Sequence, residues 1–326
     1  MGKDLVHQPS AELSTELADL VRKAEDLAAK ARSENTRRAY RSDWKKFAGW
    51  CEGHGLEAMP ASPMTVIAFL SDMAPGHTAS TIERYTATIT KAHKVAGHPS
   101  PLSDPGVQEV LSGIRKTRGM LPAQKRAAVL PILRKMCATC PQDTLRGVRD
   151  RAVLLVGWAG AFRRSEIVLI RVEDLKFVDE GVMVAVPRSK TDQEGRGQVV
   201  AIPYGSDPRT CPVRTLKRWL ELSAITTGPV FRPILRGKPS RARSPEKDGG
   251  KLISRIVKRA ARRAGLDPAA FGGHSLRSGL ATQAADAGKP DRSIMRHGRW
   301  RDRRTLDKYV REAKAWKDNA AQGIGL

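Results

Sequence analysis

Apolar residues recur at the three- and four-residue spacing of amphipathic helices along most of the chain. In the first part of the sequence this spacing predicts helices over residues 10–31, 33–51, 62–74, 78–97 and 104–116. Ser62 and Pro63 supply a helix N-cap and a first-turn proline, and Gly97 supplies a helix end. Residues 1–118 are therefore predicted to form an all-helical unit.

The helical periodicity breaks over residues 119–130, where glycine, proline and basic residues gather, and this break predicts a linker between two domains. Residues 131–326 form the predicted second domain. Its helices are expected between Pro131 and Pro141 and over residues 148–160, 163–170, 211–223, 250–264, 274–287, 291–297 and 303–316.

Alternation typical of strands occurs in residues 181–187 and 198–203, which predicts a β-hairpin with Lys190 at the end of its first strand. Residues 236–250 are basic and rich in proline, glycine and serine, so we expect an irregular loop there. The predicted fold class is mainly α: a helical N-terminal domain, followed by a mixed, mostly α domain with a small β element.

The chain is strongly basic, with 58 lysines and arginines against 34 acidic residues and a net charge of +24. Because these charges recur along the whole length, the expected partner is a polyanion, nucleic acid before membrane. No apolar run approaches the roughly 18 residues that span a bilayer, and the N-terminus lacks the apolar region of a signal peptide. We therefore expect a cytoplasmic protein that does not contact a membrane.

The cysteines include one C-x-x-C pair, Cys137 and Cys140, a spacing seen in zinc and dithiol sites. A structural zinc site needs four ligands, and neither a second pair nor a spaced histidine pair accompanies this one. The pair is therefore expected to be reduced and inert, and no metal site is predicted.

Residues 251–265 combine an apolar helix face with a dense basic face. Arg255, Lys258 and Arg259 lie on the basic face, which suits the major groove of DNA, although a solvated or lipid-facing helix has the same pattern. The further DNA-binding candidates, on the predicted helices of the first unit, are Arg37, Arg41 and Arg84.

The stretch GHSLRSG places His274 and Arg277 one helical turn apart, so both can face one anion near a helix N-terminus. The residues that follow have the small-residue spacing of a helix-turn-helix, which would indicate a transcription regulator. Tyr309 falls on the apolar stripe of the last predicted helix with Leu306 and Val310, so spacing alone predicts a core tyrosine.

Several motifs, in order along the chain, resemble those of the tyrosine recombinase (phage integrase) family, and of its Cre-like members in particular. The stretch GAFRRSEI resembles the first arginine motif of the family, with Arg163 as a phosphate-binding arginine and Glu166 as its acidic support. Lys190 matches the hairpin lysine of the family, and His274 and Arg277 match its H-x-x-R motif.

Tyr309 matches the family's nucleophile. Trp300 stands nine residues before it, where most members carry histidine and Cre-like members carry tryptophan. The helical first unit resembles the family's core-binding domain. Arg164 departs from the pattern, because the family usually has an apolar residue there.

The resemblance implies a bacterial or phage-encoded site-specific recombinase. Such an enzyme forms a 3′-phosphotyrosyl intermediate and a Holliday junction as a homotetramer, with a dimer on each of two double-stranded DNA sites. In relatives the C-terminal helix docks into a neighbouring subunit; a helix folded back on its own domain is the alternative.

The reaction requires fixed donors around the phosphate. Arg163 and Arg277 suit this task, His274 suits a base toward Tyr309, and Lys190 suits a general acid. No metal, ATP or other cofactor is expected, since cations already lie on the phosphate and no carboxylate cluster suits magnesium. The alternatives are a type IB topoisomerase, a telomere resolvase and a non-catalytic DNA-binding regulator.

Overall fold

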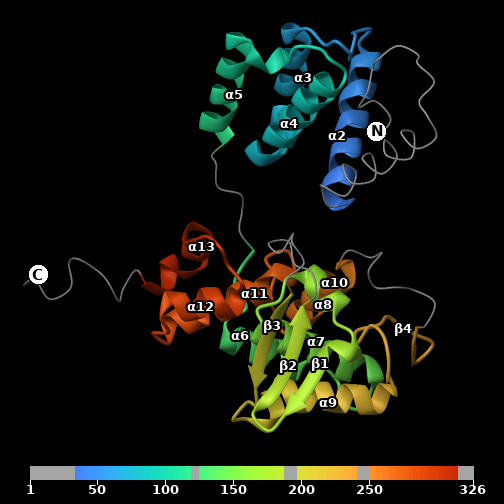
Figure 1. The fold of residues 1–326 in the computed structure, drawn as a ribbon, viewed down its shortest axis with the longest axis vertical. Helices are drawn as coiled ribbons and strands as arrows, with labels where there is room; N and C mark the ends of the chain where they lie inside the picture. Colours follow the sequence, from blue (N-terminus) through green and yellow to red (C-terminus); the bar gives the residue numbers. More distant parts are fainter. Residues whose placement is uncertain (1–33, 119–124, 187–196, 241–249, 315–326) are drawn as a thin grey trace, which may run out of the picture. The chain divides into compact units, whose positions relative to one another are not determined.

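The structure is a computed structural model that describes residues 34–118, 125–186, 197–240 and 250–314 (Figure 1). The helix predicted over residues 10–31, Lys190 with its loop, and the tail beyond residue 314 lie outside the described residues. The chain divides into two compact units, Met1–Ala123 and Gln124–Leu326. None of the described helices is long and apolar enough to cross a membrane.

The first unit is helical in every element that the structure describes. These elements are α2 (Glu34–Gly53), α3 (Pro63–Met73), α4 (Ala79–Val95) and α5 (Pro105–Arg118), with the 3₁₀ turns η1 (Ala74–Gly76) and η2 (Pro101–Ser103). The predicted cap of α3 is present, since the Ser62 hydroxyl accepts the Thr65 N–H at 3.1 Å. Gly97 follows α4 with a φ of +77°, a left-handed conformation that favours glycine.

The core of the first unit is aromatic. The Phe69 ring makes edge-to-face contacts with Phe47, Trp50 and Tyr85, at centroid distances of 5.0, 5.5 and 5.4 Å. Such pairs stabilise a core beyond the area they bury. They join α2, α3 and α4, so the predicted apolar faces of these helices meet one another.

The second unit combines a bundle of helices with a small sheet. Its helices are α6 (Leu130–Ala138), α7 (Leu145–Ala159), α8 (Arg164–Leu169), α9 (Pro212–Ser223), α10 (Lys251–Arg263), α11 (Gly273–Asp286), α12 (Asp291–Gly298) and α13 (Arg303–Lys314), with the 3₁₀ turns η3 (Val172–Asp174) and η4 (Pro208–Thr210). Figure 1 shows the sheet lying against α7 and α9. The predicted fold class is confirmed.

The strands β1 (Leu175–Val178), β2 (Gly181–Val186) and β3 (Gln198–Pro203) form one antiparallel sheet in the order β1-β2-β3. The predicted hairpin of β2 and β3 is confirmed, with Val184 opposite Val200 and both side chains buried. The strand β1 was not predicted, because four residues are too few to show an alternation.

A second hairpin forms from β4 (Ile234–Leu235) and β5 (Lys238–Pro239). Part of the segment predicted as an irregular loop is therefore a strand. The turn between the two strands consists of Arg236 and Gly237, both with positive φ, which is the backbone that tight hairpin turns require. Residues 241–249 of the same segment lie outside the described residues.

Residues 125–128, within the range predicted as linker, are bonded to the second unit. The backbone N–H groups of Arg126 and Ala128 donate to the carbonyls of Ala270 and Ser275, at 2.8 and 2.9 Å. The Ala128 carbonyl accepts the Trp158 indole N–H at 2.8 Å. A Cβ at Gly279 would lie 2.2 Å from the Ala128 oxygen. Glycine at this position of α11 therefore allows residues 125–128 to pack closely against the helix.

Candidate active site

Six of the seven predicted catalytic residues come together in the second unit, from three separate segments. Arg163 and Glu166 lie at the start of α8, His274 and Arg277 lie in the first turns of α11, and Trp300 and Tyr309 lie before and within α13. The seventh, Lys190, lies outside the described residues.

Tyr309 and His274 form the open side of the site. The Tyr309 hydroxyl lies 2.6 Å from His274 Nε2, and the two rings are 5.3 Å apart. The Thr282 hydroxyl donates to the Tyr309 backbone carbonyl at 2.7 Å, which fixes α13 against α11. The tyrosine hydroxyl is thereby held within hydrogen-bonding distance of a candidate base.

The surroundings of this pair favour a neutral histidine and a protonated tyrosine. The His274 side chain keeps a solvent-exposed edge, yet desolvation by the surrounding protein, followed by the charges of Arg277, Arg163 and Arg164, lowers its pKa. Desolvation raises the pKa of Tyr309, although Arg277 and Arg163 oppose that shift. At neutral pH the imidazole can therefore accept the proton that the tyrosine still carries.

Arg277 forms the buried side of the site. Its side chain is 2% exposed, and its Nη1 donates to the Ala161 carbonyl at 2.5 Å. Its Nη2 is buried and has no hydrogen-bond partner within the described part of the chain. Desolvation, followed by the charge of Arg163, lowers the pKa of Arg277 to about 9, so it remains a cation at neutral pH. A buried donor without a partner suits an incoming anion.

Trp300 packs against the buried side of the site. Its ring is 7% exposed and belongs to a small core with Leu306 and Val310. The guanidinium carbon of Arg277 lies 4.0 Å from the ring centroid, a cation–π contact. A Cβ at Gly298 would lie 1.7 Å from the Trp300 ring, so any residue other than glycine at position 298 would clash with it. Sequence reasoning missed the stacking of Arg277 on Trp300, because nothing in the spacing of the two residues indicates it.

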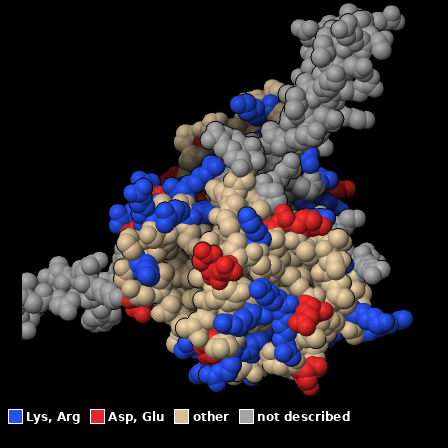
Figure 2. Space-filling model, turned by 60° about the horizontal axis from the view of Figure 1, so that its bottom comes forward, with Lys and Arg blue, Asp and Glu red and all other residues tan. Residues whose placement is uncertain are grey.

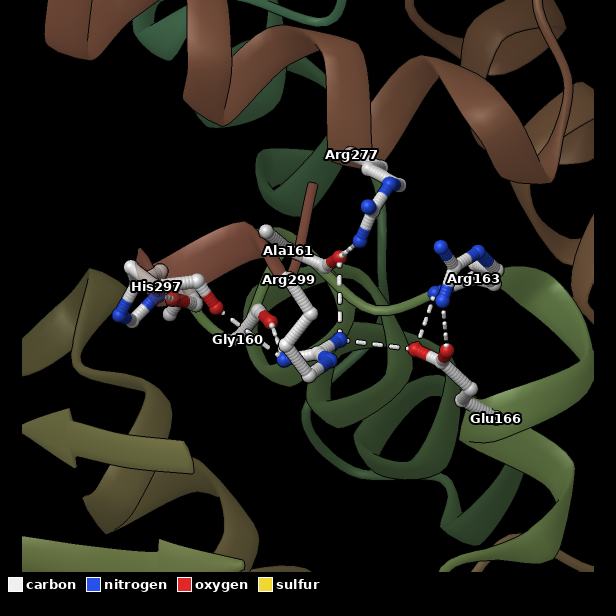
Figure 3. A network of polar contacts seen from close by, with 8 residues as sticks. Gly160, Ala161, Arg163, Glu166, Arg277, His297 and Arg299 are labelled. Atoms are coloured by element: carbon white, nitrogen blue, oxygen red, sulfur yellow. Dashed lines mark hydrogen bonds and ion pairs between the residues drawn. The ribbon is translucent and has the colours of Figure 1, made fainter. Parts of the chain in front are cut away.

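Glu166 binds two arginines, one of which sequence reasoning missed (Figure 3). Its carboxylate accepts from the Arg163 backbone N–H at 2.9 Å and from Arg163 Nη1 at 2.6 Å. It also accepts from Nη2 of Arg299 at 2.8 Å, and both partners of that ion pair are 3% exposed. Burial acts to raise the pKa of Glu166, but the charges of Arg299 and Arg163 outweigh it, so the pKa is lowered.

The DNA-binding candidates on α10 differ in their surroundings. The apolar face of α10 is buried as predicted, and Arg255 and Lys258 are exposed. The Arg259 guanidinium, however, forms an ion pair with the buried Asp150, which also binds Arg149. Arg259 is therefore partly exposed, but its guanidinium is bound to a buried carboxylate.

All three candidates of the first unit have exposed side chains, and Arg84 also forms an ion pair. Arg37 and Arg41 have exposed side chains on α2. Arg84 donates twice to the buried carboxylate of Asp43, at 2.6 and 2.9 Å. Figure 2 shows one face of the molecule, on which groups of lysine and arginine side chains are interrupted by acidic side chains and uncharged areas. On this face the positive charge is therefore unevenly spread.

The C-x-x-C pair lies in the hydrophobic core. Burial raises the pKa of Cys137 to about 12 and that of Cys140 to about 11, so neither thiol readily forms the reactive thiolate. Across the described ranges, the structure contains no group of three or more His, Cys, Asp or Glu side chains that could hold a metal ion.

The chain is similar to known proteins over most of its length. Residues 132–315 match the phage integrase family, and residues 24–98 match the phage integrase N-terminal SAM-like domain. The chain is 38% identical over 301 residues to an integrase/recombinase XerD homolog of Selenomonas ruminantium, over 91% of this chain and 87% of the relative. It is 24% identical over 324 residues to recombinase Cre of Escherichia phage P1, over 94% of this chain and 91% of Cre.

The fold resembles those of DNA-bound recombinases. A lambda integrase dimer bound to a COC′ core site matches with a TM-score of 0.61 and 16% identity, over 93% of this chain and 82% of that one. A post-cleavage complex of the XerH site-specific recombinase matches with a TM-score of 0.59 and 15% identity, over 80% of this chain and 71% of that one. The chain is an enzyme of the site-specific recombinase class. It belongs to the phage integrase (tyrosine recombinase) family, as its motifs predicted.

Proposed function

We propose that this enzyme cleaves and rejoins double-stranded DNA through a 3′-phosphotyrosyl intermediate, with Tyr309 as the nucleophile. The observation that carries the proposal is the 2.6 Å contact between the Tyr309 hydroxyl and His274 Nε2. It lies beside a buried arginine, Arg277, whose Nη2 has no partner among the described residues. A nucleophile, a base and an anion-binding donor thus meet at one place.

Arg163 and Arg277 bind the scissile phosphate in this proposal. Attack on the phosphorus places additional negative charge on the nonbridging oxygens, and a fixed donor to such an oxygen can contribute roughly 3 kcal/mol. Arg277 is held by the Ala161 carbonyl and Arg163 by Glu166, so both forks are oriented before DNA arrives. The N-terminus of α11, which carries His274 and Arg277, adds a dipole that favours an anion.

His274 accepts the proton of Tyr309 as the tyrosine oxygen attacks. Trp300 cannot take that proton, because indole is a donor only. From its place in the family motif, Lys190 is proposed as the general acid that protonates the departing 5′ oxygen. DNA with a 5′-bridging sulfur tests this role: the sulfur leaves without a proton, so Lys190→Ala should regain cleavage on that substrate, and no recovery would exclude the role.

The tyrosyl ester conserves the energy of the broken phosphodiester, so a 5′ hydroxyl from a second duplex can reseal it without ATP. A lambda integrase tetramer bound to a Holliday junction, with a TM-score of 0.58 to this chain, supports a four-subunit assembly. We propose a homotetramer on two DNA sites, with a dimer on each, that passes through a Holliday junction and needs no metal. Strand exchange that persists in EDTA is the expected result.

A nicked suicide substrate, which traps the covalent adduct, tests the proposal. Tyr309→Phe should bind DNA within a few-fold of the wild type and form no adduct, since only the nucleophilic oxygen is lost. Tyr85→Phe is a matched control, because the Tyr85 hydroxyl also faces a histidine, His77 Nε2 at 3.4 Å, but in the first unit. It should form the adduct normally. An adduct formed by Tyr309→Phe would refute the assignment.

The same assay separates the alternatives. A non-catalytic DNA-binding regulator would form no adduct with any variant, including the wild type. A type IB topoisomerase would form the adduct but would relax any supercoiled plasmid and transfer no strand between duplexes. A telomere resolvase would convert one site into two hairpin ends. Transfer of strands between two duplexes is the outcome that the proposed function requires.

A further inference from the structure

Arg299 is a buried arginine with a left-handed backbone. It follows α12, directly before Trp300, with φ +59° and ψ 43°, and its side chain is 3% exposed. The left-handed region is unfavourable for residues with a Cβ, and burial of a guanidinium is unfavourable unless the group is paired. The left-handed backbone and the buried guanidinium of Arg299 are therefore stable only because surrounding contacts hold them.

The Arg299 guanidinium binds a partner of each proposed phosphate-binding arginine (Figure 3). Its Nη2 donates to Glu166 Oε2 at 2.8 Å, the carboxylate that also pairs with Arg163. The same nitrogen donates to the Ala161 carbonyl at 3.4 Å, and that oxygen accepts from Arg277 at 2.5 Å. Arg299 thus connects the two arginines without needing to reach the phosphate itself.

The remaining contacts of Arg299 fix its orientation. Its Nη1 donates to the carbonyls of Gly160 and His297, at 3.3 and 3.2 Å. Its guanidinium carbon lies 5.0 Å from the centroid of the Phe162 ring. Gly160 and Phe162 lie in the turn between α7 and α8, and His297 lies at the end of α12. The side chain therefore joins the turn before Arg163 to the end of α12.

We infer that Arg299 is a positioning residue that neutralises Glu166, so that the charges of Arg163 and Arg277 remain available to the scissile phosphate. Arg163 and Arg299 bind the Glu166 carboxylate, and Arg277 lies close enough to interact with its charge, so the three guanidiniums and one carboxylate give +3 − 1 = +2. Removal of Arg299 leaves +2 − 1 = +1. On this buried side of the site each unit of charge interacts strongly with an anion. The inference rests on the proposed function, because it requires a DNA phosphate at Arg163 and Arg277.

Two substitutions of similar length separate charge from structure. Arg299→Gln and Arg299→Lys both lose the planar fork and keep a Cβ in the left-handed backbone, but only lysine keeps the charge. Single-turnover cleavage of the suicide substrate at saturating protein measures the chemical step apart from binding. We expect Arg299→Lys to stay within about tenfold of the wild type and Arg299→Gln to lose about a hundredfold. Equal losses would overturn the inference.

A substrate with an uncharged methylphosphonate at the scissile position separates a charge effect from a structural defect. A structural defect would slow cleavage of this substrate and of ordinary DNA by the same factor. Without the phosphate charge, the reaction depends less on the net charge around Glu166. The rate deficit of Arg299→Gln, relative to the wild type on the same substrate, should therefore shrink at least tenfold on the methylphosphonate. An unchanged deficit would mean that Arg299 serves the fold alone and would overturn the inference.

The double variant Glu166→Gln, Arg299→Gln guards against a folding failure, because it leaves no unpaired buried charge from this ion pair. It should cleave faster than Arg299→Gln alone, and a slower rate would contradict charge neutralisation. Arg236→Gln is the matched control: Arg236 is exposed, has a φ of +48° and lies in the β4–β5 turn. It should cleave at the wild-type rate. Absence of an adduct with the wild type would instead refute the proposed function.

Discussion

The arginine side of the site is mostly buried, and the tyrosine side is open. Glu166, Arg277 and Arg299 have side chains that are 2 or 3% exposed, and each is held by ion pairs or backbone carbonyls. Tyr309 is only half-buried, and His274 keeps an exposed edge. In the proposed mechanism, the charges that must stay fixed are the buried and bonded ones, and the groups that would react with DNA are the more exposed ones.

The difference follows from what each side must do. A fixed cation stabilises developing charge without reorganisation during the reaction, which requires its orientation to be set beforehand. Burial makes such a cation effective, but it also makes every lost partner costly. In the proposed mechanism the tyrosine must approach a phosphorus atom, and in the structure its hydroxyl makes one short contact, with His274. Apart from loss of the proposed nucleophile itself, substitutions on the buried side should therefore have the larger effects.

Among variants that keep Tyr309, the largest effect is expected from Arg277→Ala. This change removes a donor to the phosphate, the cation stacked on Trp300 and a bond to the Ala161 carbonyl. We expect adduct formation to slow by roughly a thousandfold, at the upper end for loss of one transition-state donor. Single-turnover kinetics on the suicide substrate measure it, and a loss of less than tenfold would show that the buried side does not hold the phosphate.

Trp300 lies between the two sides, and its variants sharpen the comparison. Phenylalanine keeps much of the apolar surface that packs on Arg277 but loses the indole donor, whereas histidine keeps a donor and loses surface. Because Trp300 packs on Arg277, Leu306 and Val310, we expect Phe and His to lie within tenfold of each other and Ala to lose about a hundredfold. Cleavage rates of the three variants test this. A rate for Trp300→His more than tenfold above that for Trp300→Phe would show that the indole hydrogen-bond donor matters more than packing.

The open side should govern the pH dependence. Desolvation and the neighbouring arginines lower the pKa of His274, so the imidazole is neutral and able to accept a proton at pH 7. As pH falls below that lowered pKa the imidazole gains a proton, and the cleavage rate should drop about tenfold per unit. The fall should therefore begin below the ordinary histidine range. A pH–rate profile measures it, and a rate that rises on acidification would exclude His274 as the base.

The smallest effects are expected on the surface of α10. Binding of DNA should weaken with salt by a log–log slope of about −0.9 for each neutralised phosphate. Lys258→Ala, at an exposed position, should reduce the magnitude of that slope by about 1 and affinity only a few-fold. Arg259→Ala should leave the slope nearly unchanged but lower thermal stability, because Arg259 pairs with Asp150. Fluorescence anisotropy across salt concentrations distinguishes the two.

The helices could be predicted from the sequence because their apolar faces are local patterns. The helix α3 begins beside its predicted cap, α4 ends just before Gly97 as predicted, and β2 and β3 lie where alternation placed them. The strand β1 and the β4–β5 hairpin could not be predicted, because segments of four and two residues carry no periodicity. Their pairing depends on contacts within the folded domain.

The residues of the site were predicted through motifs, but their contacts were not. Arg299 looks like one more surface cation in the stretch RHGRWRDRR, yet it is buried on Glu166, more than a hundred residues earlier in the chain. Arg259 and Lys258 are adjacent in sequence, and only the structure shows that Asp150 binds one of them. Ion pairs between distant residues leave no local pattern.

The most direct test of the central claim is to map the covalent bond between enzyme and DNA. The wild-type adduct on a suicide substrate is digested with nuclease and protease, and mass spectrometry locates the remaining nucleotide. We predict a nucleotide attached through its 3′ phosphate to Tyr309. Attachment to any of the other three tyrosines, Tyr40, Tyr85 or Tyr204, or attachment through a 5′ phosphate, would contradict the proposed chemistry.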